Sequence, residues 1–227
     1  MAYPDRFESD LLVTSTGDLK ITFLGHGSLM IEFNQMTIHV DPFSRVADYA
    51  QLPRADLILL THEHRDHLDP DALASVRQEG TTLVMNAACA EQLDGGIVMG
   101  NGDLQTVAGL QIEAVPAYNL LHKRPNGQPF HPPGVGNGYV VSFGDLRMYI
   151  AGDTENIPEM GALQDIDCAF LPMNLPYTMT PEMVADAART IRPKILYPYH
   201  FGDTDTSRLV ALLADEPDLE VRIRKMA

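Results

Sequence analysis

Short apolar runs separated by polar turns fill the first quarter of the chain and predict a β-meander. Residues 19–24 and 28–33 have the composition of strands, and the tripeptide Gly25-His26-Gly27 would join them. A third run, residues 36–40, follows a two-residue turn. The apolar run at residues 55–60 predicts a buried strand that leads directly into a strongly polar segment. The chain is therefore expected to begin as a sheet.

The remainder of the chain mixes helical and extended patterns. Asp69 has the place of an N-cap before Pro70 and predicts a helix over about residues 69–78, and Thr180 before Pro181 predicts another over residues 181–191. Turns that contain glycine, placed between apolar runs, indicate hairpins. The further elements expected are a strand at 81–85, a short helix at 87–93, hairpins at 104–115 and 138–150, strands at 168–172, 195–198 and 219–224, and a helix at 207–214.

A meander followed by alternating strands and helices indicates an α/β (α+β) fold. Two mixed β-sheets would pack face to face with helices on their outer sides, which makes four layers. The length of 227 residues suits one large domain, so we expect a single domain over residues 1–227, with residues 1–18 as an N-terminal extension.

Composition and charge narrow the class of protein and its partners. The chain is 45% hydrophobic and 21% charged, and no stretch approaches the roughly 20 apolar residues of a membrane span. Its net charge of −15 argues against nucleic acid as a partner, because phosphate binding depends on clustered Lys and Arg. The polar, acidic N-terminus is unlike a signal or transit peptide, so a cytoplasmic location is expected. Cys89 and Cys168 are interpreted as small buried hydrophobes rather than a disulfide. Nothing in the sequence indicates an oligomeric state.

The segment after the apolar run at 55–60 is rich in metal-binding side chains. His62, His64, Asp66 and His67 fall within six positions, and they include three of the eight histidines of the chain. A polar loop that merely caps the next helix would account for Asp69 and its proline but not for three histidines. Imidazole and carboxylate groups delivered to the end of a strand predict a site for zinc or a similar divalent cation.

Two later strands end at residues that could complete this site. The run 148–152 stops at Asp153, and the run 195–199 stops at His200. A carboxylate has two oxygens and can bridge two cations, which suits Asp153. Taken singly, Asp153 could be an ordinary turn residue and His200 a buried, hydrogen-bonded imidazole; beside the histidine cluster, we interpret both as ligands.

Residues 118–136 hold four prolines, three glycines and two histidines and predict a long surface loop. Loops of this length within a compact domain are usually functional. Its histidines, His122 and His131, could reach the metals or remain exposed. The pair Lys123-Arg124 could meet an anionic group of a ligand, or it could serve only to keep the surface soluble.

These motifs together resemble the metallo-β-lactamase superfamily. The resemblance rests on residues 61–67, on Gly152-Asp153-Thr154 and on His200. The motifs at 24–28, 40–43 and 149–154 are similar to the branch of small metal-dependent hydrolases that includes the ascorbate-6-phosphate lactonases. The resemblance covers about residues 19–203 and implies the αβ/βα sandwich of that superfamily.

The resemblance also implies a role for each residue of the site. His62 and His64 would bind a first metal, and Asp153 would bridge it to a second. The second metal would be bound by Asp66, His67 and His200.

Further residues stand near this set. Asp41 would orient a histidine of the loop from outside the coordination sphere. Asn119 stands where the family supplies a third histidine to the first metal, so Asn119 or water could fill that place, His122 or His131 could replace it, or the first site could be weakly occupied. We favour a weakened first site with His131 close to the metals. His26 could hold a substrate anion or a ligand, or be a plain turn residue.

The expected activity is hydrolysis by metal-bound hydroxide of a small ester-like, lactone or phosphodiester substrate. Asp66 would orient or deprotonate the water, and His131 or His26 would protonate the leaving group. Zinc fits the ligands best, as one or two ions, and manganese or iron would also suit a mixed oxygen and nitrogen set. The alternative is a metal-binding sensor or scaffold without turnover, which Asn119 keeps open. A nuclease would need a basic groove that this acidic chain lacks.

Overall fold

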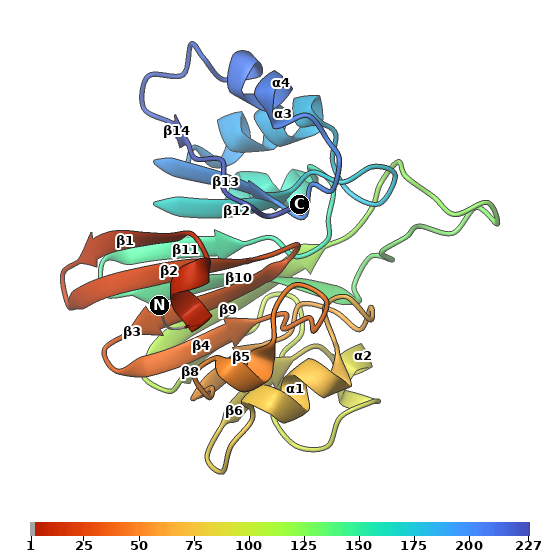
Figure 1. Cartoon of the computed structure of the whole chain (residues 1–227). Coiled ribbons are helices and arrows are strands. Elements are labelled where there is room, and N and C mark those ends of the chain that lie inside the picture. Colours follow the sequence, from red (N-terminus) through yellow and green to blue (C-terminus); the bar gives the residue numbers. More distant parts are fainter. Residues whose placement is uncertain (1–2) are drawn as a thin grey trace.

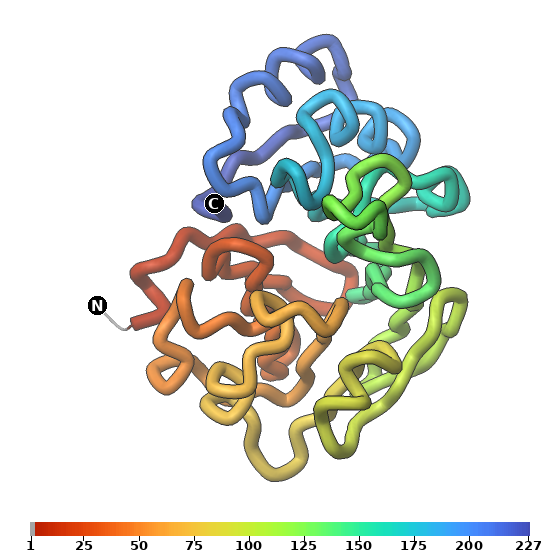
Figure 2. Tube along the Cα trace, turned by 90° about the vertical axis from the view of Figure 1, so that its right-hand side faces the viewer, coloured from red at the N-terminus to blue at the C-terminus, as the bar shows by residue number. Residues whose placement is uncertain are grey.

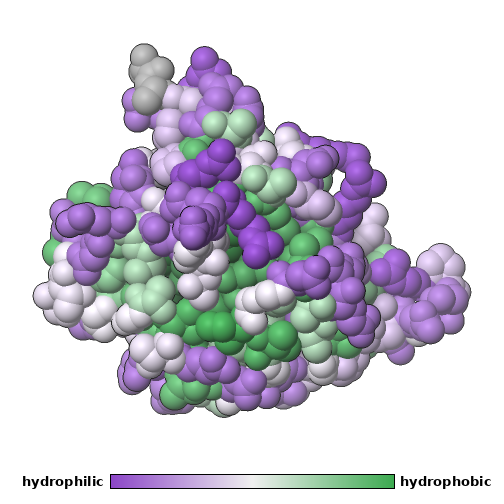
Figure 3. Space-filling model, turned by 90° about the horizontal axis from the view of Figure 1, so that it is seen from below, coloured by the Kyte–Doolittle hydropathy of each residue, from purple (hydrophilic) through white to green (hydrophobic). Residues whose placement is uncertain are grey.

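Two seven-stranded sheets face each other in the middle of the computed structural model, which describes residues 3–227 (Figure 1). The first sheet has the order β1-β2-β3-β4-β5-β6-β7 and the second β14-β13-β12-β11-β10-β9-β8. The apolar side chains between the sheets form the larger part of the core, including the rings of Phe23, Phe143 and Tyr139. Figure 3 views the molecule from below, where hydrophilic side chains gather along the rim and hydrophobic ones lie in a central band.

The first sheet begins as an antiparallel meander and continues with parallel strands. The meander holds β1 (Ser9–Thr14), β2 (Gly17–Gly25), β3 (Ser28–Phe33) and β4 (Met36–Val40). The parallel part holds β5 (Leu57–Leu59), β6 (Thr82–Met85) and β7 (Ile97–Val98). This sheet is therefore mixed, as expected.

The second sheet repeats the same plan. Its meander consists of β8 (Leu104–Val107), β9 (Leu110–Ala117), β10 (Gly136–Phe143) and β11 (Leu146–Ile150). Its parallel strands are β12 (Cys168–Pro172), β13 (Ile195–Tyr199) and β14 (Glu220–Val221). The meander pattern thus belongs to both halves of the chain rather than to the first alone, and the strand–helix pattern likewise occurs in both.

Helices cover the outer faces of the sheets and complete the four layers (Figure 1). On the first sheet lie α1 (Pro70–Val76) and α2 (Ala87–Ala90), which share a second apolar cluster with that sheet. On the second lie α3 (Pro181–Ile191) and α4 (Thr206–Leu212). The remaining helical turns are η1 (Tyr3–Arg6), η2 (Tyr49–Gln51) and η3 (Pro158–Ala162). No helix within residues 3–227 is long and apolar enough to cross a membrane.

Strand β1 corrects the expectation that residues 1–18 are only an extension. Residues 9–14 pair with β2 over six positions. Leu12 packs into the core, whereas Leu11 and Val13 are exposed at 59% and 80%. Asp10 binds the guanidinium of Arg224, close to the C-terminus. The strand is held by this ion pair and by its backbone pairing with β2. Because its outward-facing residues are apolar, the sequence lacks the alternation of apolar and polar residues that indicates a strand.

The helix N-termini follow the expected capping chemistry. Asp69 accepts hydrogen bonds from the amides of Asp71 and Ala72, and Thr180 accepts one from Met183. The α1 helix ends at Val76, two residues before the expected boundary, and α2 and β14 are also shorter than expected. The strand ends are the part of the fold that matters for function, because several histidine and aspartate side chains follow them at one rim.

Candidate metal centre

Asp41 and His67 form a fully buried pair at the ends of β4 and β5. Asp41 Oδ2 lies 2.7 Å from His67 Nδ1. The backbone N–H and the hydroxyl of Thr61 also donate to this carboxylate. Because an ionised carboxylate only accepts, His67 Nδ1 carries the hydrogen and His67 Nε2 faces the site. The structure therefore places Asp41 behind the ring of His67, on the side away from the other donors.

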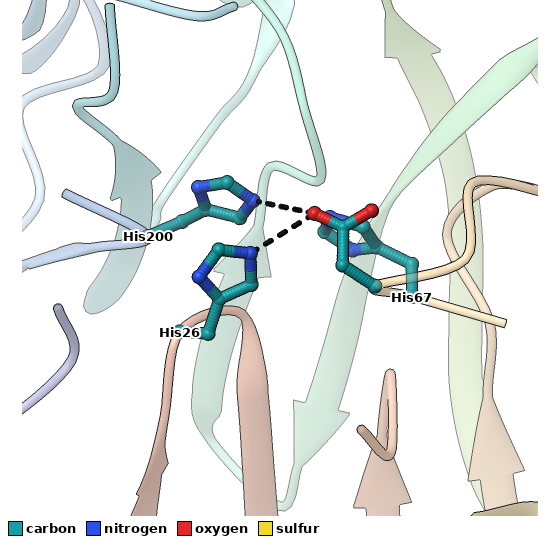
Figure 4. A group of neighbouring side chains, drawn as sticks. His26, His67 and His200 are labelled. Carbon is teal, nitrogen blue, oxygen red and sulfur yellow. Dashed lines mark hydrogen bonds and ion pairs between the residues drawn. The ribbon is translucent and has the colours of Figure 1, made fainter. Parts of the chain in front are cut away.

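His26, Asp66, His67 and His200 bring one potential ligand atom each within 4.8 Å of one another. His26 Nε2 lies 2.9 Å from Asp66 Oδ2, and His200 Nε2 lies 3.4 Å from the same oxygen (Figure 4). His26 comes from the turn between β2 and β3, and its carbonyl accepts the amide hydrogen of His200 after β13. His26 thus lies among the potential metal ligands.

His62, His64 and His131 form a second group of donor atoms within 4.8 Å. His62 Nε2 and His131 Nε2 lie 3.1 and 3.2 Å from His64 Nδ1. His131 belongs to the loop at residues 118–135, which lies between the C-terminal elements above and the yellow elements below (Figure 2). Of the two loop histidines, it is the one that the structure brings to the cluster.

Asp153 lies between the two groups. Its Oδ1 is 3.5 Å from His67 Nε2, and its Oδ2 is 3.3 Å from His131 Nε2 and 3.6 Å from His200 Nε2. The preceding Gly152 has a φ of 65°, and a Cβ there would lie 2.8 Å from the carbonyl oxygen of Asn137. Glycine therefore permits the sharp turn that carries this carboxylate from β11 into the site.

Asn119 lies outside both groups of donors. Its Oδ1 accepts the backbone N–H of His131 and lies 2.8 Å from His131 Nδ1. Its Nδ2 donates to the carbonyl of Tyr177 and to Glu155 Oε1, which fixes the direction of the amide. His131 therefore donates from Nδ1 to this amide oxygen, and its Nε2 faces His64 and Asp153. The structure places Asn119 behind the ring of His131, which belongs to the group with His62 and His64.

Glu155 is the residue of this region that the sequence reasoning missed. It is completely buried, and its carboxylate accepts the amide hydrogens of Leu120, Leu121 and His122 at 2.7–2.8 Å. His122 Nδ1 lies 2.7 Å from Glu155 Oε1, so this ring faces the glutamate instead of the donor groups. The only signal in the sequence was an acid directly after Gly-Asp-Thr. Glu155 ties the loop to the strand end that carries Asp153.

Neighbouring histidines keep the two carboxylates of the cluster ionised in spite of their burial. Burial raises the pKa of Asp153, but the rings of His200 and His67 outweigh it and hold the pKa well below its ordinary value. Burial also raises the pKa of Asp66, and the nearby rings of His200 and His26 outweigh it, so this pKa is lowered as well. Ionised carboxylates are the form that binds a cation.

The histidines differ in the direction of their pKa shifts. Burial lowers the pKa of His62 far below its ordinary value and lowers that of His64, which keeps both rings neutral. Burial acts the same way on His67, but the carboxylates of Asp153 and Asp41 outweigh it and raise its pKa well above the ordinary value. A cation at His67 Nε2 would compete with a proton for the same lone pair.

Three buried atoms of this cluster have no hydrogen-bond partner within residues 3–227: His67 Nε2, Asp153 Oδ1 and His200 Nε2. Buried polar atoms in folded proteins are nearly always paired, so such a concentration needs an explanation. A divalent cation would satisfy all three, and the set of imidazoles and carboxylates is suited to it. The residues present therefore fit one or two bound divalent cations.

A pocket of about 450 Å³ opens onto the cluster. Besides histidine and aspartate side chains of the cluster, it is lined by Arg65, Arg124, Phe130, Asn174 and Tyr177. Arg65 comes from the histidine loop, Arg124 and Phe130 from the loop at 118–135, and the other two from the segment after β12. The volume is that of a small-molecule site.

The chain belongs to the metallo-β-lactamase superfamily: the family model described as the beta-lactamase superfamily domain matches residues 20–200. Within it, the chain belongs to the branch of small metal-dependent hydrolases. It is 33% identical over 196 residues to a UPF0173 metal-dependent hydrolase of Methanopyrus kandleri, a match that covers 81% of this chain and 84% of the relative.

Solved structures agree with this assignment. A crystal structure from Parabacteroides distasonis, of a protein described as a proposed metal-dependent hydrolase, is 49% identical, with a TM-score of 0.93 over 97% of this chain and 100% of that one. Igni18, a metallo hydrolase from Ignicoccus hospitalis, shares the fold at 24% identity, with a TM-score of 0.75 over 92% of this chain and 96% of that one. The expected four-layer sandwich is thus confirmed.

Proposed function

We propose that this protein is a metal-dependent hydrolase that acts on a small ester-like, lactone or phosphodiester substrate. The observation that carries the proposal is the convergence of three unpaired buried donor atoms, from residues 67, 153 and 200, beside a pocket of small-molecule size. The relatives in the same branch, which are named metal-dependent hydrolases, support it.

The donor groups suggest how two cations would be held. His62, His64 and His131 would bind the first, which gives it three imidazoles. His67 and His200, together with Asp66, would bind the second. Asp153 lies near donors of both groups and would bridge the two positions. In this arrangement Asn119 is not a ligand, and the first position is not weakened.

Zinc is the cation that a set so rich in imidazole fits best, and manganese or iron would also suit the mixed donors. When bound, a divalent cation would lower the pKa of a coordinated water to about 7 and so supply a nucleophile at neutral pH.

Asp66 and His26 would handle the protons of the reaction. Asp66 is ionised, so His26 donates its Nε2 hydrogen to Asp66 Oδ2 over 2.9 Å and holds that carboxylate in place. Asp66 would orient the attacking water or take its proton. The proton that Asp66 takes from the water would pass to His26, and His26 would give a proton to the leaving oxygen, so that the ring ends neutral. His131, which we had considered for that step, would be occupied as a ligand.

The test combines metal analysis with turnover. Protein purified without added ions is assayed for bound metal and then for hydrolysis of a panel of lactones, phosphodiesters and esters. We expect one or two equivalents of a divalent cation, and we expect His67→Ala to lose both metal and activity. His122→Ala is the matched control, because His122 faces Glu155 outside the donor groups. A protein that binds metal but turns over no member of the panel would contradict the proposal. The alternative of a sensor or scaffold rested on Asn119, and the position of His131 removes that reason for it.

A further inference from the structure

Two arginines line the pocket beside the donor groups. Arg65 stands between His64 and Asp66 in the histidine loop, and Arg124 stands near the tip of the loop at 118–135. The two residues reach the same pocket from distant parts of the chain. They place two permanent positive charges at its wall.

Neither guanidinium forms an ion pair with a carboxylate in the part of the chain that the structure describes. Arg65 is exposed, and Arg124 donates from Nη2 to the carbonyl of Phe130. Some other basic side chains pair with acids, as in the ion pairs between Lys20 and Glu32, Lys194 and Asp167, Arg189 and Glu216, and Arg224 and Asp10. In a chain of net charge −15, two arginines without an acidic partner at one pocket leave a local site for an anion.

Arg124 is supported by aromatic packing. Its guanidinium lies over the ring of Phe130, 5.2 Å from the centroid, and Phe130 in turn packs edge-on against Tyr177 at 5.0 Å. Both rings line the pocket. Only one of the five N–H groups of the guanidinium has a hydrogen-bond partner within residues 3–227, so the others can reach a ligand.

The neighbouring Lys123 differs from Arg124. Its backbone forms an isolated bridge with Pro129, and its side chain is not part of the pocket wall. The structure therefore separates the two members of the Lys123-Arg124 pair. Arg124 is the one placed to meet a ligand, and Lys123 remains a surface charge.

We propose that Arg65 and Arg124 form an anion subsite, which holds a carboxylate or phosphate group of the substrate while its scissile bond lies at the donor groups. The proposal rests on the proposed hydrolase function and names the substrate class: small esters, lactones or phosphodiesters that carry a second, anionic group. Guanidinium groups bind both carboxylate and phosphate through paired N–H donors.

The arginines would act on binding more than on the chemical step. They touch a part of the substrate that does not react, so their contacts have similar strength in the ground state and the transition state. Loss of such a contact raises KM and leaves kcat largely unchanged. This distinguishes them from the donor groups, whose loss would lower kcat.

The kinetic test uses three substrates that differ only in the distal group, which is a methyl ester, a carboxylate or a phosphate. The variants are Arg65→Gln and Arg124→Gln, with Lys123→Gln as the control that removes the same charge from the adjacent position. We expect the wild type to prefer an anionic substrate, and each arginine variant to raise KM for it about tenfold, as for the loss of one charge-assisted hydrogen bond of about 1.4 kcal/mol. Lys123→Gln should match the wild type. Comparison of the carboxylate with the phosphate tells which anion is used.

Equal kcat/KM for the neutral and anionic substrates would overturn the proposal, and so would an equal loss in Lys123→Gln. A binding arm tests the subsite without turnover: the metal-loaded protein and its three variants are titrated with inorganic phosphate and with acetate by calorimetry. If no substrate is hydrolysed but the arginine variants alone bind these anions more weakly, the hydrolase function fails and the subsite stands. If all variants bind them equally, the subsite fails. Melting temperatures of the variants confirm that each is folded.

Discussion

The carboxamide oxygen of Asn119 lies 2.8 Å from Nδ1 of His131 and supports that ring from behind. Asp41 has the same relation to His67 on the other side of the cluster, at 2.7 Å. Each acceptor fixes the hydrogen on Nδ1 and leaves Nε2 facing the other donors. Both groups of donors thus contain a histidine that is held through Nδ1, by an amide oxygen in one group and by a carboxylate in the other.

Replacement of Asn119 should weaken metal binding without unfolding the protein. Asn119→Ala removes the acceptor for His131 Nδ1 and for its backbone N–H. Because outer partners of this kind typically contribute 10- to 100-fold to metal affinity, we expect a loss of about that size for one equivalent of metal. Competition with a chromophoric chelator measures it. The control is Asn126→Ala in the same loop, whose side chain forms hydrogen bonds only with the nearby Gln128 among residues 3–227. Unchanged affinity in Asn119→Ala would contradict the proposed role of His131.

The two loop histidines should behave differently when each is changed to alanine. His131→Ala removes a donor from the group with His62 and His64, so we expect one equivalent of metal to be lost or bound at least about tenfold more weakly. His122→Ala should retain the metal and lose about 1 kcal/mol of stability with its hydrogen bond to Glu155. Elemental analysis and chemical unfolding of both variants measure these effects. The opposite result would place His122 at the metal.

Glu155→Gln should destabilise the metal-free protein in a way that depends on pH. Burial raises the pKa of Glu155, but the amide hydrogens of His122, Leu121 and Leu120 outweigh it and lower the pKa below its ordinary value. The stability that this carboxylate contributes is therefore present above its unfolded pKa of about 4.3 and is lost as the pH falls through the lower folded pKa. We expect a loss of about 1–3 kcal/mol at pH 7, since buried amide hydrogens lose their charged acceptor.

Urea unfolding of Glu155→Gln and the wild type across this pH range measures the difference, which should shrink toward low pH. Glu159→Gln is the control, because Glu159 is exposed and accepts only from the hydroxyl of Tyr118. A difference from the wild type that stays constant with pH would show that the charge of Glu155 is not what stabilises the loop.

Gly27→Ala should disturb the cluster through a steric contact. A Cβ at this position would lie 3.0 Å from Cε1 of His67 and 3.6 Å from Cδ2 of His200. The ring of His67 would have to move by a few tenths of an ångström, and its pairing with Asp41 resists that movement. We expect metal affinity to fall about tenfold, as for other changes to the surroundings of a ligand. Gly161→Ala is a suitable control, because a Cβ there would meet only Thr190, at 3.8 Å. Equal affinity in the two variants would refute the expectation.

The strand ends of the site could be predicted from the sequence, and the loop could not. Asp153 and His200 follow apolar runs that become β11 and β13, so their meeting at one rim follows from the sheet. The place of His131 depends on Glu155, which holds the amides of residues 120–122 and reaches Asn119 through space. Such contacts produce no periodic pattern in the sequence. The register of the strand was therefore the only guide to the third ligand of the first metal, and it pointed to Asn119.

Two features of the fold were likewise hidden from pattern analysis. Leu11 and Val13 point outward on β1, so the run that contains them has no clear apolar face. The shared plan of the two sheets, in which a meander is followed by parallel strands, is a property of topology that leaves no repeat visible by eye in the sequence.

His26 and His200 connect the two sheets by a backbone hydrogen bond of 2.9 Å, and the donors around them come from both halves of the chain. Any cation held there would link the halves more strongly than that single bond does. The free concentration of metal in the surroundings would then set the melting temperature of the protein as well as its activity, since a ligand that binds only the folded state stabilises it by mass action. Starvation for metal would shorten the lifetime of the whole protein.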